Sequence, residues 1–176
     1  MNLSVNTIIR VLLVDDHSVM RSGLRLLIES EPGFKVVGEA GSPPDAISAA
    51  TRTQPDIILL DLDLRSFNGL DLLPDLLAAS SESKVLILTG VLDPQAHHRA
   101  VQLGAKGLVL KETAPQVLIQ AIEKVYQGEI WLNRQMIAEL LTQKWELPGK
   151  LNPEASKIAT LTERERELIS LIGEGL

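Results

Sequence analysis

The sequence contains no cysteine, which excludes a disulfide framework and any metal site built from thiolates. Aromatic residues make up only 3% of the 176 residues, and no apolar run is long enough to cross a membrane. Basic residues are outnumbered by acidic ones, 17 to 23, and the net charge of −6 argues against a large nucleic-acid surface. Residues 1–7 lack the apolar core of a signal peptide, so we expect a cytoplasmic protein without membrane contacts.

Apolar residues are plentiful by contrast and make up 45% of the chain, which supports a folded core. The run of residues 56–61 reads Asp-Ile-Ile-Leu-Leu-Asp, has no helical period and follows Pro55. This pattern predicts a buried strand of a parallel sheet. Its last residue, Asp61, would then lie at the carboxyl edge of the sheet, where open α/β folds bind their ligands.

Strand patterns and helix patterns alternate along most of the chain. The predicted strands are residues 8–14, 34–40, 56–61, 84–89 and 107–110. The predicted helices are residues 18–29, a helix that opens at Ser42, and residues 69–79, 94–103 and 114–127. Five strands that alternate with five helices predict a doubly wound α/β domain with a five-stranded parallel sheet.

Local signals within and between these elements lead to four further expectations. Ser18 is predicted to cap the first helix, and Pro74 would cost the third helix a hydrogen bond, which predicts a late start or a kink. Residues 62–68, between the third strand and the third helix, are expected to form a loop. The residues predicted to face the core from the first helix are Val19, Gly23, Leu26 and Leu27.

Polar residues stand at the ends of four predicted strands. They are Asp15 and Asp16 after the first strand, Asp61 at the end of the third, Thr89 at the end of the fourth and Lys111 after the fifth. If the strands lie side by side, these residues meet at one edge, where three carboxylates suit a hard cation such as Mg²⁺. A carboxylate beside that cation can attack a phosphoryl group, because the cation screens the repulsion between two anions. Lys111 would pair with the transferred phosphate, and Thr89 would donate a hydrogen bond to it.

This arrangement resembles the receiver domain of two-component response regulators, over residues 8–128. The matching positions are Asp15 and Asp16 at the acidic pair, Asp61 at the phosphoacceptor, Thr89 at the switch hydroxyl and Lys111 at the phosphate-pairing lysine. Each residue stands at the end of its own strand and in the family's order. The resemblance implies a flavodoxin-like sheet with the strand order 2-1-3-4-5.

The resemblance also implies a Mg²⁺ site and a partner. Asp16, Asp61 and the backbone carbonyl of Asp63 would bind the ion directly, and Asp15 would act mostly through water. The protein would accept phosphate on Asp61 rather than act as an enzyme, apart from slow loss of its own phosphate. The implied phosphate donor is a histidine kinase or a phosphotransfer protein.

The end of the chain carries a second resemblance. Residues 161–176, opened by a capping box at Thr162–Glu165, resemble the first helix of a LuxR-type helix-turn-helix. The whole is then similar to the NarL/FixJ subfamily, with residues 129–160 as a linker that contains a short helix. This similarity implies control of transcription and DNA binding through the output domain of a longer native chain. It is also compatible with a homodimer. The recognition helix is absent, so no base-contacting residue can be named.

Three residues depart from the family pattern. Arg65 replaces the usual proline of the loop after the phosphoacceptor. Leu108 replaces the usual aromatic residue of the fifth strand, so we expect no aromatic switch. Asp63 places an acid two residues after the phosphoacceptor, close to where water would attack.

Two other functions stay open. The acidic charge and the missing recognition helix favour a receiver that acts only through protein contacts, with a truncated output. Residues 58–63 also resemble the nucleophile motif of haloacid-dehalogenase-like phosphatases, although here the motif lies on the third strand and not near the N-terminus.

The three histidines carry no metal-site pattern. His17, His97 and His98 are interpreted as solvated histidines, because no matching ligand spacing accompanies them.

Overall fold

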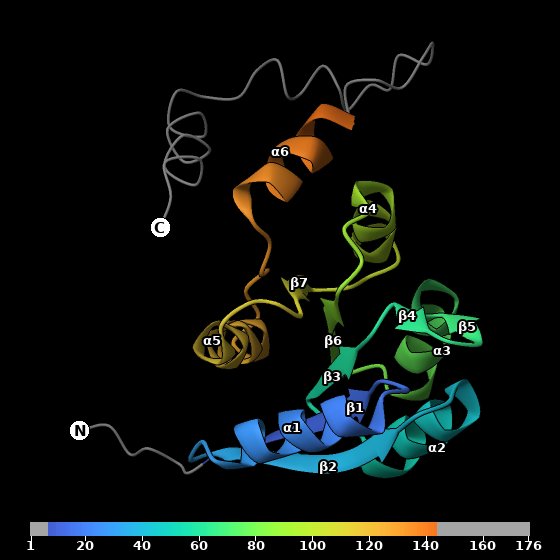
Figure 1. The fold of residues 1–176 in the computed structure, drawn as a ribbon, viewed down its shortest axis with the longest axis vertical. Coiled ribbons are helices and arrows are strands. Elements are labelled where there is room, and N and C mark those ends of the chain that lie inside the picture. The colour runs from blue at the N-terminus through green and yellow to red at the C-terminus, as the bar shows by residue number, and fades with distance from the viewer. Residues whose placement is uncertain (1–6, 144–176) are drawn as a thin grey trace. The chain divides into compact units, whose positions relative to one another are not determined.

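The computed structural model describes residues 7–143 (Figure 1). The chain divides into two units, residues 1–132 and residues 133–176, and the first unit holds the sheet. The predicted first helix of a helix-turn-helix, residues 161–176, and the linker from residue 144 onward lie outside the described residues. No helix among residues 7–143 combines the length and hydropathy needed to span a membrane.

The first unit is built on a five-stranded parallel sheet in the order β2-β1-β3-β6-β7. Counted along the chain, this is the expected order 2-1-3-4-5, so the predicted α/β fold is confirmed. The observed strands lie within one residue of the predicted ends. They are β1 (Ile9–Val14), β2 (Phe34–Ala40), β3 (Ile57–Leu60), β6 (Lys84–Thr89) and β7 (Gly107–Leu110).

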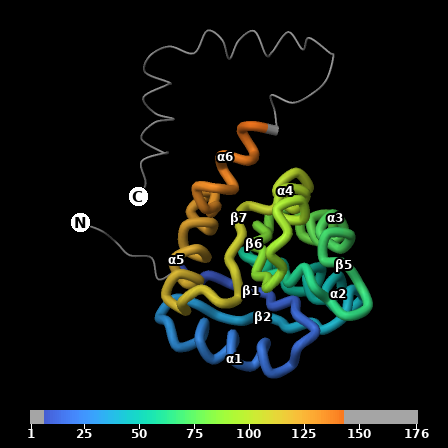
Figure 2. The backbone as a smooth tube through the Cα atoms, turned by 45° about the horizontal axis from the view of Figure 1, so that its top comes forward, coloured from blue at the N-terminus to red at the C-terminus, as the bar shows by residue number. Residues whose placement is uncertain are grey.

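Helices cover both faces of the sheet (Figures 1 and 2). The helices of the first unit are α1 (Ser18–Glu29), α2 (Pro43–Thr53), α3 (Gly69–Ala79), α4 (Pro94–Gln102) and α5 (Pro115–Tyr126). One layer holds α1 and α5, and the opposite layer holds α2, α3 and α4, packed side by side. The second unit contributes α6 (Arg134–Gln143), within the predicted linker.

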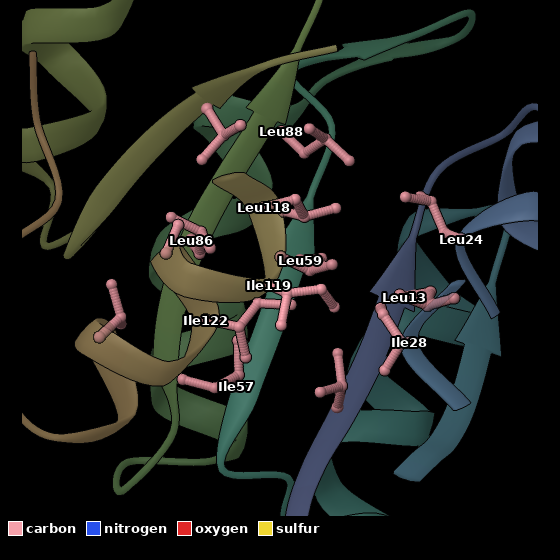
Figure 3. Packing of buried hydrophobic residues seen from close by; sticks show 14 of the residues in the cluster. Leu13, Leu24, Ile28, Ile57, Leu59, Leu86, Leu88, Leu118, Ile119 and Ile122 are labelled. Carbon is pink, nitrogen blue, oxygen red and sulfur yellow. The ribbon is translucent and has the colours of Figure 1, made fainter. Parts of the chain in front are cut away.

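A continuous core lies between the sheet and the layer of α1 and α5. Figure 3 shows Leu13, Leu59 and Leu86 on one face of three neighbouring strands, against Ile28 of α1 and Ile122 of α5. Because side chains alternate along a strand, the residues in between face the opposite layer. Both faces are therefore buried, which is why these strands read as unbroken apolar runs.

The inner face of α1 differs from the prediction. Val19 and Leu26 were expected inside but are 84% and 75% exposed, whereas Leu24 and Ile28 are buried. The buried positions are four residues apart on one side of the helix, and Val19 and Leu26 lie on its outer side. The predicted cap is also wrong, because His17 and not Ser18 occupies the N-cap position, without a side-chain capping bond.

The segment between β3 and α3 is more ordered than predicted. Within the expected loop, β4 (Asp63–Leu64) pairs with β5 (Phe67–Asn68) as a short antiparallel hairpin. The side chain of Asn68 accepts a hydrogen bond from Leu70 N, 2.9 Å away, and so caps α3. The helix begins at Gly69 and contains Pro74, so the late start is wrong.

Candidate functional site

Backbone hydrogen bonds extend the sheet past the strand ends and fix three of the predicted site residues. Asp15 N donates to Ala40 O (3.1 Å), and Asp61 N donates to Val14 O (2.9 Å). Lys111 N donates in the same way to the carbonyl of Thr89, at 2.9 Å. The ends of parallel strands thus hold Asp15, Asp61 and Lys111 at one edge of the sheet, as the sequence predicts.

Lys111 bridges two buried carboxylates. Its Nζ lies 2.8 Å from Asp15 Oδ2 and 2.7 Å from Asp61 Oδ2. Asp15 is 3% exposed and Asp61 2% exposed, so both carboxylates have lost nearly all contact with water. A buried carboxylate needs a partner, and here one ammonium group serves two of them.

The pKa values follow from this burial. Burial raises the pKa of Asp61 above its ordinary 3.8, and the hydrogen bond from Lys111 offsets this effect only in part. Burial lowers the pKa of Lys111, but its hydrogen bonds to Asp15 and Asp61 outweigh burial, so this pKa lies above the ordinary 10.5. Lys111 therefore keeps its proton at neutral pH. One ammonium group thus faces two carboxylates at this edge of the sheet.

Asp16 lies beside this pair and has different partners. Its Oδ2 accepts a hydrogen bond from Arg65 N (2.9 Å) and lies 3.5 Å from Arg65 Nε. Burial raises the pKa of Asp16, but the Arg65 amide and the charges of His17 and Arg65 outweigh burial and lower it below 3.8. Its Oδ1 is buried and accepts no hydrogen bond, although His17 Nδ1 lies 2.9 Å away.

His17 is exposed, as the interpretation as a solvated histidine predicts, but its ring also reaches the acids of the site. Its Nδ1 lies 3.1 Å from Asp15 Oδ1, and its backbone N donates to the same oxygen at 2.8 Å. Asp15, Asp16, His17 and Asp61 each offer one ligand atom, and these atoms all lie within 4.8 Å of one another. The sequence signal for His17 was its position directly after the acidic pair.

The donor set fits a divalent cation. Three carboxylates converge, and the buried Asp16 Oδ1 has no hydrogen bond that a cation would have to displace. Asp63 stands apart from this cluster, because its side chain is exposed. Its backbone N donates to Asp61 Oδ1 at 3.1 Å and so orients the carboxylate.

Thr89 and His97 are linked through the backbone of Val91 after the end of β6. Thr89 is fully buried, and its Oγ1 accepts a hydrogen bond from Val91 N at 3.1 Å. Among the hydrogen bonds of residues 7–143, none joins this hydroxyl to the acids. His97 is 8% exposed and its Nε2 lies 2.6 Å from Val91 O, so the interpretation as a solvated histidine is wrong.

Residues 11–123 match the family model of the response regulator receiver domain. The chain belongs to the response regulators. This response regulator is 35% identical over 168 residues to a nitrate/nitrite response regulator homolog of Haemophilus influenzae, a match that covers 96% of this chain and 77% of the relative.

Other relatives are of the NarL/LuxR type. The response regulator is 36% identical to the DNA-binding transcriptional activator DevR/DosR of Mycobacterium tuberculosis, over 96% of this chain and 76% of that protein. A solved two-component response regulator of the LuxR family, from Aurantimonas, has 32% identity and a TM-score of 0.71, covering 80% of this chain and 100% of the other. The protein is thus a two-component response regulator rather than a classical enzyme, which rules against the haloacid-dehalogenase alternative.

Proposed function

We propose that this response regulator controls transcription by accepting a phosphoryl group on Asp61 from a histidine kinase or phosphotransfer protein. The observation that carries this proposal is the placement of Asp61. It lies at the carboxyl end of β3, buried, within 2.7 Å of Lys111 Nζ and next to two further acids. A carboxylate so placed can act as a nucleophile while the surrounding charges hold an incoming phosphoryl group.

The transfer itself needs little from the protein beyond position and charge. An oxygen of Asp61 forms a bond to phosphorus while the phosphorus–nitrogen bond of the donor phosphohistidine breaks, and the imidazole leaves and takes up a proton. Lys111 is already at the carboxylate and can pair with the phosphoryl oxygens. The Asp63 amide holds Asp61 Oδ1, which leaves the carboxylate with a fixed orientation.

Mg²⁺ is the ion proposed for the acidic cluster. Asp16, Asp61 and the backbone carbonyl of Asp63 would hold it directly, and Asp15, whose two oxygens already accept hydrogen bonds from His17 and Lys111, would act through water. When bound, the ion supplies positive charge that offsets repulsion between the carboxylates and the phosphoryl group. This assignment is supported by the buried Oδ1 of Asp16, which accepts no hydrogen bond and lies 2.9 Å from His17 Nδ1.

The output is proposed from the relatives. One of them is named a DNA-binding transcriptional activator, and the alignments cover three-quarters or more of the relatives' length. We propose that residues 161–176 begin a LuxR-type helix-turn-helix, that residues 129–160 link it to the receiver at 8–128, and that DNA is bound by the output domain of a longer native chain. A homodimer and a cytoplasmic location are proposed from the resemblance to the response regulator family.

Mass spectrometry after incubation with Mg²⁺ and acetyl phosphate tests the phosphoacceptor. The wild type is expected to gain the mass of one phosphoryl group, and Asp61→Asn to gain none. Asp75→Asn is the matched control, because it removes an exposed carboxylate of α3 that lies outside the acidic cluster, and it should leave labelling intact. Labelling that persists in Asp61→Asn would refute the assignment.

A further inference from the structure

The Thr89 hydroxyl is occupied in this structure. It lies at the end of β6, fully buried, and accepts a hydrogen bond from Val91 N at 3.1 Å. A hydroxyl that turns toward a phosphoryl group on Asp61 must leave or weaken this contact. The state of Thr89 is therefore tied to the position of the Val91 backbone.

The Val91 backbone is held from its other side by His97. The carbonyl oxygen of Val91 lies 2.6 Å from His97 Nε2. A carbonyl can only accept, so Nε2 is the nitrogen that carries the proton. His97 itself is fixed in α4, because its backbone N donates to Asp93 O at 3.1 Å and its side chain is buried.

These bonds form one continuous chain from the sheet to a helix. Thr89 ends β6, Val91 lies in the connecting loop, and His97 lies in α4. Leu108, on the neighbouring strand, is buried and has no polar side-chain atom with which to join such a chain. The polar route from Thr89 toward α4 thus runs through Val91 and His97.

We propose that His97 is a positioning residue that latches the loop after β6 in the resting conformation. The proposal rests on phosphorylation of Asp61. While Nε2–H holds the Val91 carbonyl, the Val91 amide stays where it can hold the Thr89 hydroxyl. When Thr89 turns to the phosphoryl oxygen, the latch loses one end and α4 is free to shift. A ligand moves such an equilibrium only through contacts that differ between the two states, and these hydrogen bonds differ.

A matched control lies next to the latch. His98 belongs to the same helix and has the same side chain, but its Nδ1 is buried without a hydrogen-bond partner. Replacing His98 by phenylalanine changes the size and polarity of a ring without touching Val91. Replacing His97 by glutamine retains an N–H donor, whereas His97→Phe retains a ring and removes the donor.

The test is a titration of the 176-residue chain with beryllofluoride and Mg²⁺, followed by ¹H–¹⁵N NMR of the amides of residues 89–103. His97→Phe should reach half-saturation at about one-fifth of the wild-type beryllofluoride concentration, the factor that corresponds to losing one neutral hydrogen bond from the resting state. His97→Gln should stay close to the wild type, and His98→Phe should match it.

The proposal fails if His97→Phe and wild type titrate alike, or if His98→Phe shifts as far as His97→Phe. A measurement on the wild type tests the proposal independently of whether the variants fold. The His97 Nε2–H signal should exchange slowly with water before beryllofluoride is added and lose this protection at saturation; unchanged protection refutes the latch. If the wild type does not bind beryllofluoride at Asp61 at all, the proposed phosphoacceptor falls, which is a distinguishable result.

Discussion

The acidic site has two halves that are held in different ways. Asp15, Asp61 and Lys111 continue the backbone hydrogen bonds of the sheet and meet at 2.7–2.8 Å. On the other half, Asp16 meets His17 and Arg65, whose side chains are 45% and 76% exposed, and the Arg65 guanidinium is 3.5 Å away. The strand-held half, Asp15, Asp61 and Lys111, fixes the proposed phosphoacceptor through the sheet. The loop-held half is Asp16 with His17 and Arg65, and it places a proposed cation ligand that is only 11% exposed next to two exposed side chains.

The largest expected effects come from β6 and β7, the strands that end next to the strand-held half. Leu108→Ala should lower the free energy of unfolding by about 2–4 kcal/mol, because it leaves a cavity at a buried position in β7. It should still show the beryllofluoride-induced NMR shifts in residues 90–103. Thr89→Ala should lose those shifts, since the hydroxyl that reports the phosphate is gone. Urea unfolding and NMR measure the two effects.

Leucine would be a true switch residue if Leu108→Ala erased the response while remaining folded and still binding beryllofluoride. That result would replace the polar route through the loop after β6 with a packing route through β7. In that case the interior of β7, and not only the residues at the strand ends, would transmit the effect of phosphorylation.

A smaller loss of stability is expected from a substitution at Gly69, where the start of α3 packs closely against the backbone of Asp61. A Cβ added at Gly69 would lie 2.3 Å from the Asp61 carbonyl oxygen and 2.8 Å from Leu62 Cα, both backbone atoms that cannot turn away. Gly69→Ala should therefore cost about 1–3 kcal/mol in urea unfolding and reduce labelling by acetyl phosphate. Gly23→Ala is the control: nothing lies within 4 Å, and alanine should stabilise α1 by about 1 kcal/mol. Equal effects at the two glycines would contradict this reading of α3.

The strand-held half is the part that the sequence predicts well. A parallel strand buried on both faces is apolar in its interior, so residues 57–60 and 85–88 stand out between their polar neighbours. Parallel strands also bring their carboxyl ends to one edge, which is enough to predict that Asp15, Asp61 and Lys111 meet. These inferences need only local pattern and the rule of sheet geometry.

The errors concern side-chain partners and packing, which local patterns do not encode. Apolar residues occur on both sides of α1, and only packing against the sheet and α5 decides that Leu24 and not Leu26 is inside. The burial of His97 cannot be predicted locally, because its partner is a backbone carbonyl, which has no sequence signature. His17 does carry a signal for its contact with the acids, since it directly follows two of them.

Mg²⁺ affinity tests the role proposed for Asp16 in the loop-held half. Asp16→Asn should weaken Mg²⁺ binding by roughly tenfold or more, because it alters the carboxylate whose buried Oδ1 has no hydrogen bond. Asp15→Asn should weaken binding less, since both Asp15 oxygens already accept hydrogen bonds in the protein. Isothermal titration with Mg²⁺ gives both affinities. Equal or reversed losses would contradict the assignment of Asp16 as a direct ligand and of Asp15 as a ligand that acts through water.

The smallest expected effect is the pH dependence of stability at Asp61. Because burial raises the folded-state pKa of Asp61 above the ordinary 3.8, the ionised form is less favourable in the folded protein than in the unfolded chain. The contribution of Asp61 is therefore most favourable below pH 3.8 and is lost as pH rises through the raised pKa. Lys111 does not alter this window, because its pKa lies above 10.5 and its pairing is constant from acidic to neutral pH.

Asp61→Asn removes this cost, and the amide oxygen can still accept a hydrogen bond from Lys111, which also keeps its bond to Asp15 at 2.8 Å. Thermal melts in EDTA should thus show a slightly higher midpoint for Asp61→Asn than for the wild type at pH 7. The difference should shrink as pH falls toward 3.8, where the wild-type carboxyl becomes protonated and resembles the amide. The exposed Asp63→Asn provides the comparison for a charge removed without burial. A lower midpoint for Asp61→Asn at pH 7 would show that the Lys111 pair outweighs burial, and that the strand-held half is stabilised by its charges.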